Sequence, residues 1–282
     1  MVAAWTVGRI LLAEALHRRA QPRLPGTVRA AMDERDQVTP AQVLSVALAE
    51  PLIRPGDRVL ELGCGRGGAM MALAKLHPEA RFVGLDGDEG CVDAARAAAR
   101  TGGVTNVRWL VTELNDLDRF ADDAFDVIVS SFALHQLSAT RDLRRCMVHL
   151  RRILSRGGRI GVADFVRPRS SWSMQALARV APATLAGAGA DLLRAAFTAE
   201  QLHHVAEATG LMDRAHARHH VARPVPLIQV IQSPPTGDPT PEFAHSLARL
   251  TDRLSEPARQ ELDTLARLLL RGGVDTALAA SG

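Results

Sequence analysis

Short apolar runs alternate with longer amphipathic stretches through the middle of the chain. Apolar runs bounded by glycine, proline and aspartate predict strands at 58–62, 81–85, 106–111, 125–130 and 158–164. The stretches between them have helical periodicity and predict helices at 67–76, 88–101 and 139–154. Alternation with short connections is typical of a doubly wound, mostly parallel sheet, whose ligand binds at the carboxyl ends of the strands.

Capping signals place several helix ends. Thr39 to Gln42 forms a capping box with proline at the first helical position, which predicts a helix over 40–53. Gly157-Gly158 predicts the end of helix 139–154. A second capping box, Thr198 to Gln201, begins a helix that should end at Gly210.

The strand pattern continues after this helix, with predicted strands at about 213–221 and 226–232, so the sheet should have seven strands. The fold class expected is therefore α/β with helical additions. The predicted units are a helical N-terminal cap over 1–54, a ligand-binding domain over 55–232 with a helical insertion at 166–197, and a linker with C-terminal helices over 233–282.

Composition limits the possible functions. Hydrophobic residues make up 47% of the chain and charged residues 23%, as in ordinary globular proteins. A formal net charge of +3 argues against a protein built mainly to bind nucleic acid. Three widely separated cysteines give no disulfide framework or zinc motif, which fits a reducing cytoplasm. Arg9 and Glu14 interrupt the N-terminal apolar stretch, so neither a signal peptide nor a membrane span is expected there.

The first strand ends in a glycine-rich turn, "ELGCGRGG", in which Gly63, Gly65 and Gly68 spell G-x-G-x-x-G. Such a turn commonly places a dinucleotide pyrophosphate on helix N-terminal amides. Glu61 stands at its entrance, where a carboxylate would repel a phosphate. A ligand with an ammonium and a sulfonium but no phosphate suits this turn better, and S-adenosylmethionine is such a ligand.

An acidic residue ends the second predicted strand. Asp86 follows Gly63 by 23 positions, where a carboxylate meets ribose hydroxyls in nucleotide-binding folds of this kind. NAD and S-adenosylmethionine both carry a ribose, so Asp86 indicates the ribose and does not distinguish the two.

Five segments, in order, resemble the motifs of the class I S-adenosylmethionine-dependent methyltransferases over about residues 55–165. They are "VLELGCGRGG", "FVGLDGDEGCVDAA", "NVRWLVTELNDL", "FDVIVSSFALHQL" and "LRRILSRGGRIGVADF". The resemblance implies a Rossmann-like fold and S-adenosylmethionine as cofactor, while the cysteine and histidine spacings predict no metal site. The cofactor-binding residues that it implies are Glu61, Gly63, Cys64, Gly65, Gly67, Asp86, Gly87, Glu113, Leu114 and Ser130. Glu113 stands where the family usually has an aspartate that contacts adenine.

His135, just past the fourth strand, is the catalytic candidate, because histidine titrates near neutral pH. A general base, a residue that shapes the site and a packing residue all remain open interpretations of it. Ser131 and Gln136 could bind substrate in the same turn, and Asp164 at the end of the fifth strand is a second candidate.

Other residues have structural and functional interpretations. Trp109 fits a core aromatic better than an adenine-stacking residue, and Asp88 fits a helix cap better than a ligand contact. A small residue suits the position of Cys64, and nothing predicts a reactive thiol. The histidines lack a recognised metal-ligand spacing and indicate a packed or solvated group. They are His203, His204, His216, His219 and His220.

The resemblance implies an enzyme that transfers a methyl group to a small molecule or a short peptide, with secondary metabolism as a candidate setting. Insertion 166–197 resembles a helical lid over the cleft, and a core helix is the alternative. The C-terminal leucines at 241–271 favour packing on the domain or a homodimer contact. A non-methylating enzyme of the same fold, a non-catalytic scaffold subunit and an NAD-dependent oxidoreductase are the competing hypotheses.

Overall fold

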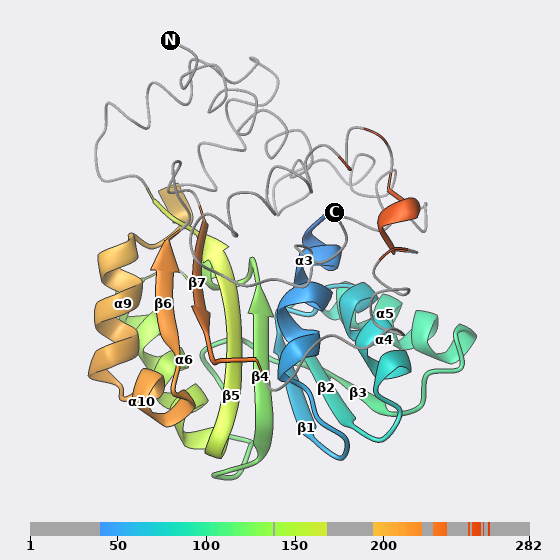
Figure 1. The fold of residues 1–282 in the computed structure, drawn as a ribbon, viewed down its shortest axis with the longest axis horizontal. Coiled ribbons are helices and arrows are strands. Elements are labelled where there is room, and N and C mark those ends of the chain that lie inside the picture. The colour runs from blue at the N-terminus through green and yellow to red at the C-terminus, as the bar shows by residue number, and fades with distance from the viewer. Residues whose placement is uncertain are drawn as a thin grey trace.

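The structure is a computed structural model that describes residues 40–137, 139–167, 194–221, 228–235, 248, 250–254, 256 and 259. Its centre is a seven-stranded sheet in the order β3-β2-β1-β4-β5-β7-β6 (Figure 1). The strands β1 to β5 pair in parallel, while β7 is antiparallel to both β5 and β6. The bounds are β1 Arg58–Leu62, β2 Arg81–Asp86, β3 Val107–Val111, β4 Phe125–Ser131, β5 Leu154–Phe165, β6 Arg218–Val221 and β7 Ile228–Gln232. The prediction of a doubly wound, mostly parallel seven-stranded sheet is confirmed.

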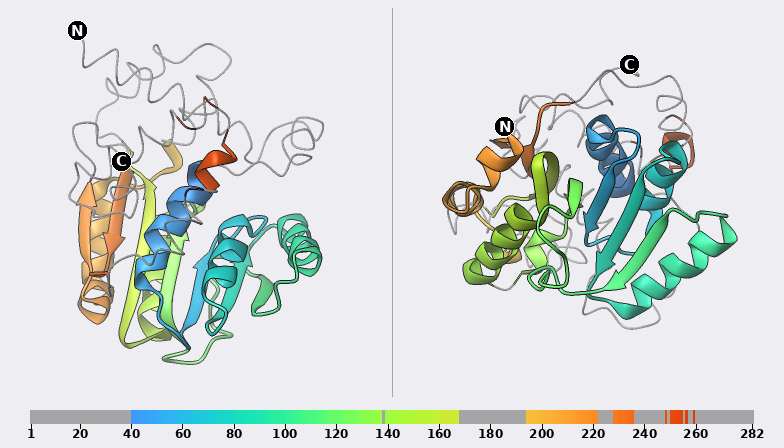
Figure 2. Two further views of the ribbon diagram at one scale, coloured as in Figure 1. Left: turned by 45° about the vertical axis from the view of Figure 1, so that its right-hand side comes forward. Right: turned by 90° about the horizontal axis from the view of Figure 1, so that it is seen from below.

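Helices cover both faces of this sheet (Figure 2). The described helices are α3 Pro40–Ala49, η1 Glu50–Leu52, α4 Gly68–Leu76, α5 Glu89–Thr101, η2 Leu134–Gln136, α6 Thr140–Ile153, α9 Ala199–Ala208 and α10 Leu211–Ala215. Apolar side chains of α3, α4 and α5 form one hydrophobic cluster with the sheet, and those of α6, α9 and α10 form another. Burial on both faces explains why the central strands read as nearly continuous apolar runs.

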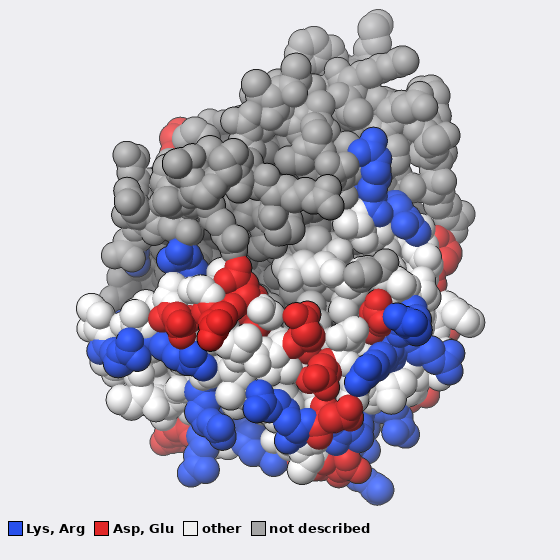
Figure 3. Space-filling model, turned by 180° about the vertical axis from the view of Figure 1, so that it is seen from behind, with Lys and Arg blue, Asp and Glu red and all other residues white. Residues whose placement is uncertain are grey.

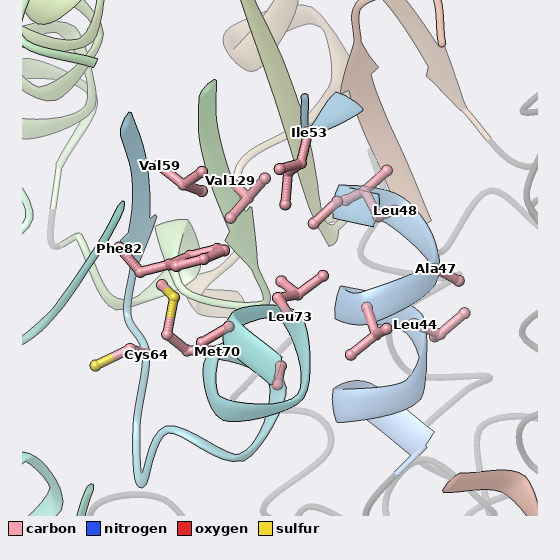
Figure 4. Packing of buried hydrophobic residues seen from close by; sticks show 14 of the residues in the cluster. Leu44, Ala47, Leu48, Ile53, Val59, Cys64, Met70, Leu73, Phe82 and Val129 are labelled. Atoms are coloured by element: carbon pink, nitrogen blue, oxygen red, sulfur yellow. The ribbon is translucent and has the colours of Figure 1, made fainter. Parts of the chain in front are cut away.

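Helix α3 packs on the middle of the sheet beside α4. Figure 4 shows Leu44 and Leu48 of α3 close to Leu73 of α4, with Val129 and Phe82 of the strands beside them. Leu254, from the C-terminal part of the chain, is 4% exposed and belongs to the same cluster. Leu254 therefore packs on the domain, while most of the C-terminal leucines lie outside the described residues, and a homodimer stays a prediction.

The predicted helix end at Gly157-Gly158 is wrong. Helix α6 ends at Ile153, and β5 begins at once at Leu154. The glycines lie inside β5, where the pairing with β4 shifts register and Gly157 has a φ of +72°. A glycine at positive φ serves a bulge as well as a helix cap, so the dipeptide alone could not separate the two.

The predicted strand 213–221 is only partly correct. Helix α10 occupies Leu211–Ala215, His216 has a left-handed φ of +48°, and β6 begins at Arg218. The alternation that predicted a longer strand reflects a short helix that buries Leu211 and Ala215 on the sheet. His216 and His220 therefore do not share a strand face.

Two predicted caps are confirmed. The Asp88 side chain accepts a hydrogen bond from Cys91 N–H at the start of α5, as expected of a helix cap. The Thr198 and Gln201 side chains form the reciprocal capping box at the start of α9.

Several predictions lie outside the described residues. These are residues 1–39, which include Thr39 and most of the N-terminal cap, positions 168–193 of the insertion 166–197, and most of 233–282. The unit boundaries at 54 and 232 stay predictions. Among the described helices, none has the length and apolar character that crossing a membrane requires.

Candidate functional site at the carboxyl edge of the sheet

The glycine turn lies between β1 and α4, at the carboxyl edge of the sheet. Gly63, Gly65 and Gly67 have φ values of +69°, +52° and +77°, which side-chain-bearing residues rarely adopt. Close neighbours add a second restriction, because a Cβ on Gly63 would overlap Ala133 and one on Gly67 would overlap Trp109. The turn therefore presents bare backbone to the edge of the sheet, as a site for close backbone approach requires.

Asp86, at the end of β2, joins this turn. One of its carboxylate oxygens accepts a hydrogen bond from Gly65 N–H at 2.9 Å, and the other accepts from Asp88 N–H at 2.9 Å. The structure thus brings together the glycine turn and the acidic residue that the sequence placed 21 to 23 positions away.

Glu61 is buried beneath the turn, with 5% of its surface exposed. Its Oε2 atom has no hydrogen-bond partner, and burial, with a smaller contribution from the nearby Asp86 charge, raises the pKa of Glu61 to about 8. Leaving a buried carboxylate unpaired is costly. An ammonium group beside Glu61 would pair that oxygen and favour the ionised form, so the residues present fit the amino-acid end of S-adenosylmethionine.

The remaining predicted cofactor residues surround the same edge. Gly87 faces Glu113, whose Oε1 lies 3.1 Å from the place of a Gly87 Cβ, and Leu114 is buried beside them. The Ser130 hydroxyl is buried and donates to the Leu62 carbonyl at 3.2 Å. Their contacts with a cofactor stay predictions.

Cys64 and Trp109 lie beneath the turn. Trp109 is 6% exposed and packs in the hydrophobic cluster, so it is a core aromatic as expected. Burial, together with the charges of Glu61 and Asp86, raises the pKa of the Cys64 thiol far above its ordinary value. A thiol that resists ionisation is a poor nucleophile, which agrees with a packing role.

A second group of polar side chains lies at the ends of β4 and β5. His135 Nδ1 is 2.9 Å from Asp164 Oδ1, and Asp164 Oδ2 accepts from the His135 backbone N–H at 3.0 Å. His135 is 9% exposed and Asp164 is 2% exposed. The sequence named both residues as candidates but held no sign that they form a pair, because 29 positions separate them.

Two phenylalanine rings pack beside the His135–Asp164 pair. Phe165 packs against the His135 ring with centroids 5.5 Å apart, and Phe132 stacks on Phe165 at 4.9 Å. Phe132 has a φ of +57°, a rare conformation for a bulky residue, and such outliers concentrate at functional sites. Sequence analysis missed both phenylalanines, since in the sequence they are ordinary strand-end aromatics.

Helix α3 also reaches this edge. A Cβ on Gly68 would overlap the side chain of Gln42, so Gln42 lies against the start of α4. The sequence indicated Gln42 only as part of a capping box, so its place near the glycine turn was not predicted.

Two of the five grouped histidines make ring-stacking and hydrogen-bond contacts. His203 and His219 stack with ring centroids 5.3 Å apart, and His219 Nε2 is 3.2 Å from Gln229 Oε1. Burial lowers the pKa of His219 to about 4. In the part of the chain that the structure describes, no three or more histidine, cysteine, aspartate or glutamate side chains are arranged to hold a metal ion.

Positive and negative side chains are interspersed on the described surface seen in Figure 3. Exposed ion pairs, such as Arg145 with Asp118 at 3.5 Å, occur among the described residues. A mixed surface differs from the continuous basic face with which proteins track a phosphate backbone.

Comparison with known proteins identifies the domain. Residues 59–158 match the family described as "Methyltransferase domain". The uncharacterized methyltransferase YcgJ of Bacillus subtilis is 32% identical over 115 residues, which are 41% of this chain and 43% of that protein.

Two further relatives have more specific names. The tRNA (guanine-N(7)-)-methyltransferase of Shewanella halifaxensis is 34% identical over 97 residues, covering 34% of this chain and 37% of that protein. The ubiquinone/menaquinone biosynthesis C-methyltransferase UbiE of Vibrio vulnificus is 32% identical over 117 residues, covering 41% and 44%. The chain thus spans less than half the length of each of these relatives. The matched residues 59–158 run from β1 into β5, and over them this chain has a class I, Rossmann-like methyltransferase domain, of the type that uses S-adenosylmethionine as cosubstrate.

Proposed function

We propose that the protein transfers a methyl group from S-adenosylmethionine to a small molecule or a short peptide. One observation carries this proposal: the buried Glu61 carboxylate has an unpaired oxygen under a bare glycine turn, beside Asp86. A diphosphate placed there would meet the Asp86 carboxylate and leave Glu61 without a counter-charge, whereas an ammonium would favour ionised Glu61 and pair with it.

Each residue of this edge would have a separate part. Glu61 would hold the ammonium group, the backbone of Gly63 and Gly65 would line the amino-acid moiety, and Asp86 would accept hydrogen bonds from the ribose hydroxyls. Glu113, next to Gly87, would contact the adenine. When bound, S-adenosylmethionine supplies a methyl group activated by a sulfonium. The protein then has to align the acceptor and exclude water.

A small acceptor is supported by the weak net charge of +3 and by the interspersed surface charges. The names of these two relatives refer to a tRNA guanine and to ubiquinone/menaquinone biosynthesis, so likeness to them does not select an acceptor. Cytoplasmic location and a role in secondary metabolism remain predictions.

Calorimetric titration of the full chain with S-adenosylhomocysteine, S-adenosylmethionine and NAD tests the proposal. We expect the two sulfur compounds to bind and NAD not to bind. Glu61→Gln should weaken binding of S-adenosylhomocysteine, whereas Glu89→Gln, on the first turn of α5, should leave it unchanged. Binding of NAD, or of none of the three, would contradict the proposal.

Measuring the release of S-adenosylhomocysteine then distinguishes a methyltransferase from a non-methylating enzyme and from a scaffold subunit. An enzyme of the proposed type forms it in proportion to methylated product. A non-methylating enzyme of the same fold would consume an acceptor without forming it, and a scaffold subunit would bind the cofactor without turnover.

A further inference from the structure

We infer that His135 and Asp164 form a general-base pair, in which Asp164 positions His135, and that the methyl acceptor therefore loses a proton from its nucleophilic atom. This inference rests on the proposed function. It names the acceptor as a compound whose nucleophilic group gives up a proton, such as an O–H or N–H group, in place of a thioether or tertiary amine nucleophile.

The hydrogen bonds of Asp164 determine which nitrogen of His135 carries a proton. Asp164 Oδ1 accepts from Phe165 N–H at 2.6 Å, and Oδ2 accepts from His135 N–H at 3.0 Å. A carboxylate held by two backbone N–H groups is an acceptor, so the 2.9 Å contact with His135 Nδ1 makes Nδ1 the donor. The proton of a neutral His135 is then on Nδ1, and Nε2 carries the free lone pair.

The ring is also fixed in space. The backbone of His135 is tied to the same carboxylate as its ring, and Phe165 packs against the ring at 5.5 Å between centroids. Asp164 satisfies the Nδ1 donor, so Nε2 is the ring nitrogen left for a ligand. The described residues provide Nδ1 with a partner and give Nε2 no hydrogen bond.

The location of the pair matches a proton acceptor for the proposed reaction. His135 follows β4 and Asp164 lies near the end of β5, at the carboxyl edge that also holds the glycine turn. Ala133, two residues before His135, lies against Gly63 of that turn, so His135 and the cofactor turn are close in space. Binding in a doubly wound sheet occurs at this edge.

The proton and bond changes are as follows. The acceptor atom forms a bond to the methyl carbon while the carbon–sulfur bond breaks and its electron pair stays on sulfur. His135 Nε2 takes the proton that the acceptor atom loses, and the imidazolium later gives that proton to water. Base catalysis of this kind contributes about 10²–10⁴-fold to rates. Acceptors without a transferable proton would gain nothing from the pair.

Nitrogen-15 NMR of the histidine rings tests the positioning role without any acceptor. His135→Gln identifies the His135 signals by their loss. In the wild-type protein we expect neutral His135 to carry its proton on Nδ1. In Asp164→Asn the amide can turn its NH₂ toward Nδ1, and the proton should move to Nε2. A wild-type His135 with its proton on Nε2, or an unchanged tautomer in Asp164→Asn, would overturn the inference.

Methylation assays test the acceptor class. Catechol and 4-nitrophenol serve as O–H probes, and pyridine serves as a nitrogen nucleophile without a proton. We expect S-adenosylhomocysteine formation from the phenols, and a fall of about 10²-fold or more in kcat with Asp164→Asn while KM changes little. Methylation of pyridine but of neither phenol would overturn the inference.

Binding of S-adenosylhomocysteine keeps this inference separate from the proposed function. Asp164→Asn should bind S-adenosylhomocysteine as tightly as the wild-type protein does, because the pair holds no part of the cofactor. If S-adenosylhomocysteine fails to bind the wild-type protein, the proposed function fails. If it binds but the tautomer is wrong, only the base pair fails.

Discussion

The two halves of the carboxyl edge are built in opposite ways. At the ends of β1 and β2 the site consists of bare backbone and a buried carboxylate, Glu61, with an unpaired oxygen. At the ends of β4 and β5 it consists of side chains, and the Asp164 carboxylate accepts hydrogen bonds on both oxygens.

This difference suits the β1–β2 half to binding a ligand and the β4–β5 half to orienting a side chain. An unpaired buried carboxylate is unstable alone and gains most from an incoming cation. The Asp164 carboxylate accepts hydrogen bonds from two backbone N–H groups and contacts the His135 ring, and it holds that ring in one tautomer and orientation. The same residue type therefore serves two tasks, according to whether the fold satisfies it.

The largest effect is expected from Gly63→Ala, which changes the glycine turn at the end of β1. The new Cβ would overlap Ala133, and alanine would have to adopt a φ of +69°. Strain and overlap together should lower the free energy of unfolding by about 3–5 kcal/mol. Urea unfolding measures this change.

Gly103→Ala is the matched control. Gly103 has a φ of +66° but no atom within 4 Å of an added Cβ, so it carries the strain without the overlap. A loss of about 1 kcal/mol is expected. Equal losses in the two variants would mean that Ala133 does not restrict the turn.

The next effect concerns the pH dependence of cofactor binding. Free Glu61, with its pKa raised to about 8, is protonated at pH 6, and a cationic ligand requires it to ionise. The affinity for S-adenosylhomocysteine should therefore rise about 10-fold per pH unit below pH 8 and release a proton on binding. Calorimetry in two buffers of different ionisation enthalpy measures both quantities. A Glu61→Gln protein with the same slope would assign the proton to another group.

Asp86→Ala should weaken S-adenosylhomocysteine binding by about 10-fold or more, because a lost charge-assisted hydrogen bond typically costs about 1.5–3 kcal/mol. It also frees Gly65 N–H and Asp88 N–H, but folding should largely survive. Asp93→Ala, on the exposed face of α5, is the control and should bind normally. Unchanged affinity in Asp86→Ala would remove Asp86 from the ribose site.

The smallest effect is expected from Glu50→Gln, which tests a second buried carboxyl group outside the glycine turn. Glu50 lies in η1 with Oε2 unpaired, and burial raises its pKa to about 7. Folding disfavours the ionised form, so this group's stabilising contribution is full below about pH 4.5 and is lost as the pH rises toward 7. Glu50→Gln should remove about 1–2 kcal/mol of the fall in unfolding free energy between pH 5 and 7.

Urea unfolding at the two pH values, with the exposed Glu79→Gln as control, measures this term. A Glu50→Gln protein that loses stability with pH as steeply as wild type would show that other groups account for the fall. Because Glu50 lies away from the glycine turn, its substitution should not change binding of S-adenosylhomocysteine.

Some errors of sequence analysis have a clear physical origin. Gly157-Gly158 predicted a helix end, yet the glycines form a bulge in β5, because positive φ is common to both structures. The stretch before β6 alternates like a strand, but helix α10 forms there because it buries Leu211 against the sheet. Local patterns cannot show which of two allowed conformations the core will select.

By itself, the sequence determined the order of strands and helices, the glycine turn, and the positions of Glu61, Asp86 and Asp88, because these depend on neighbours close along the chain. Only the tertiary structure decided that Glu61 lacks a partner and that Asp164 holds His135. Both facts concern contacts between residues on different strands. Parallel strands bring their carboxyl ends together whatever the distance between them in the sequence, so the partners of a buried charge become known only once the sheet has formed.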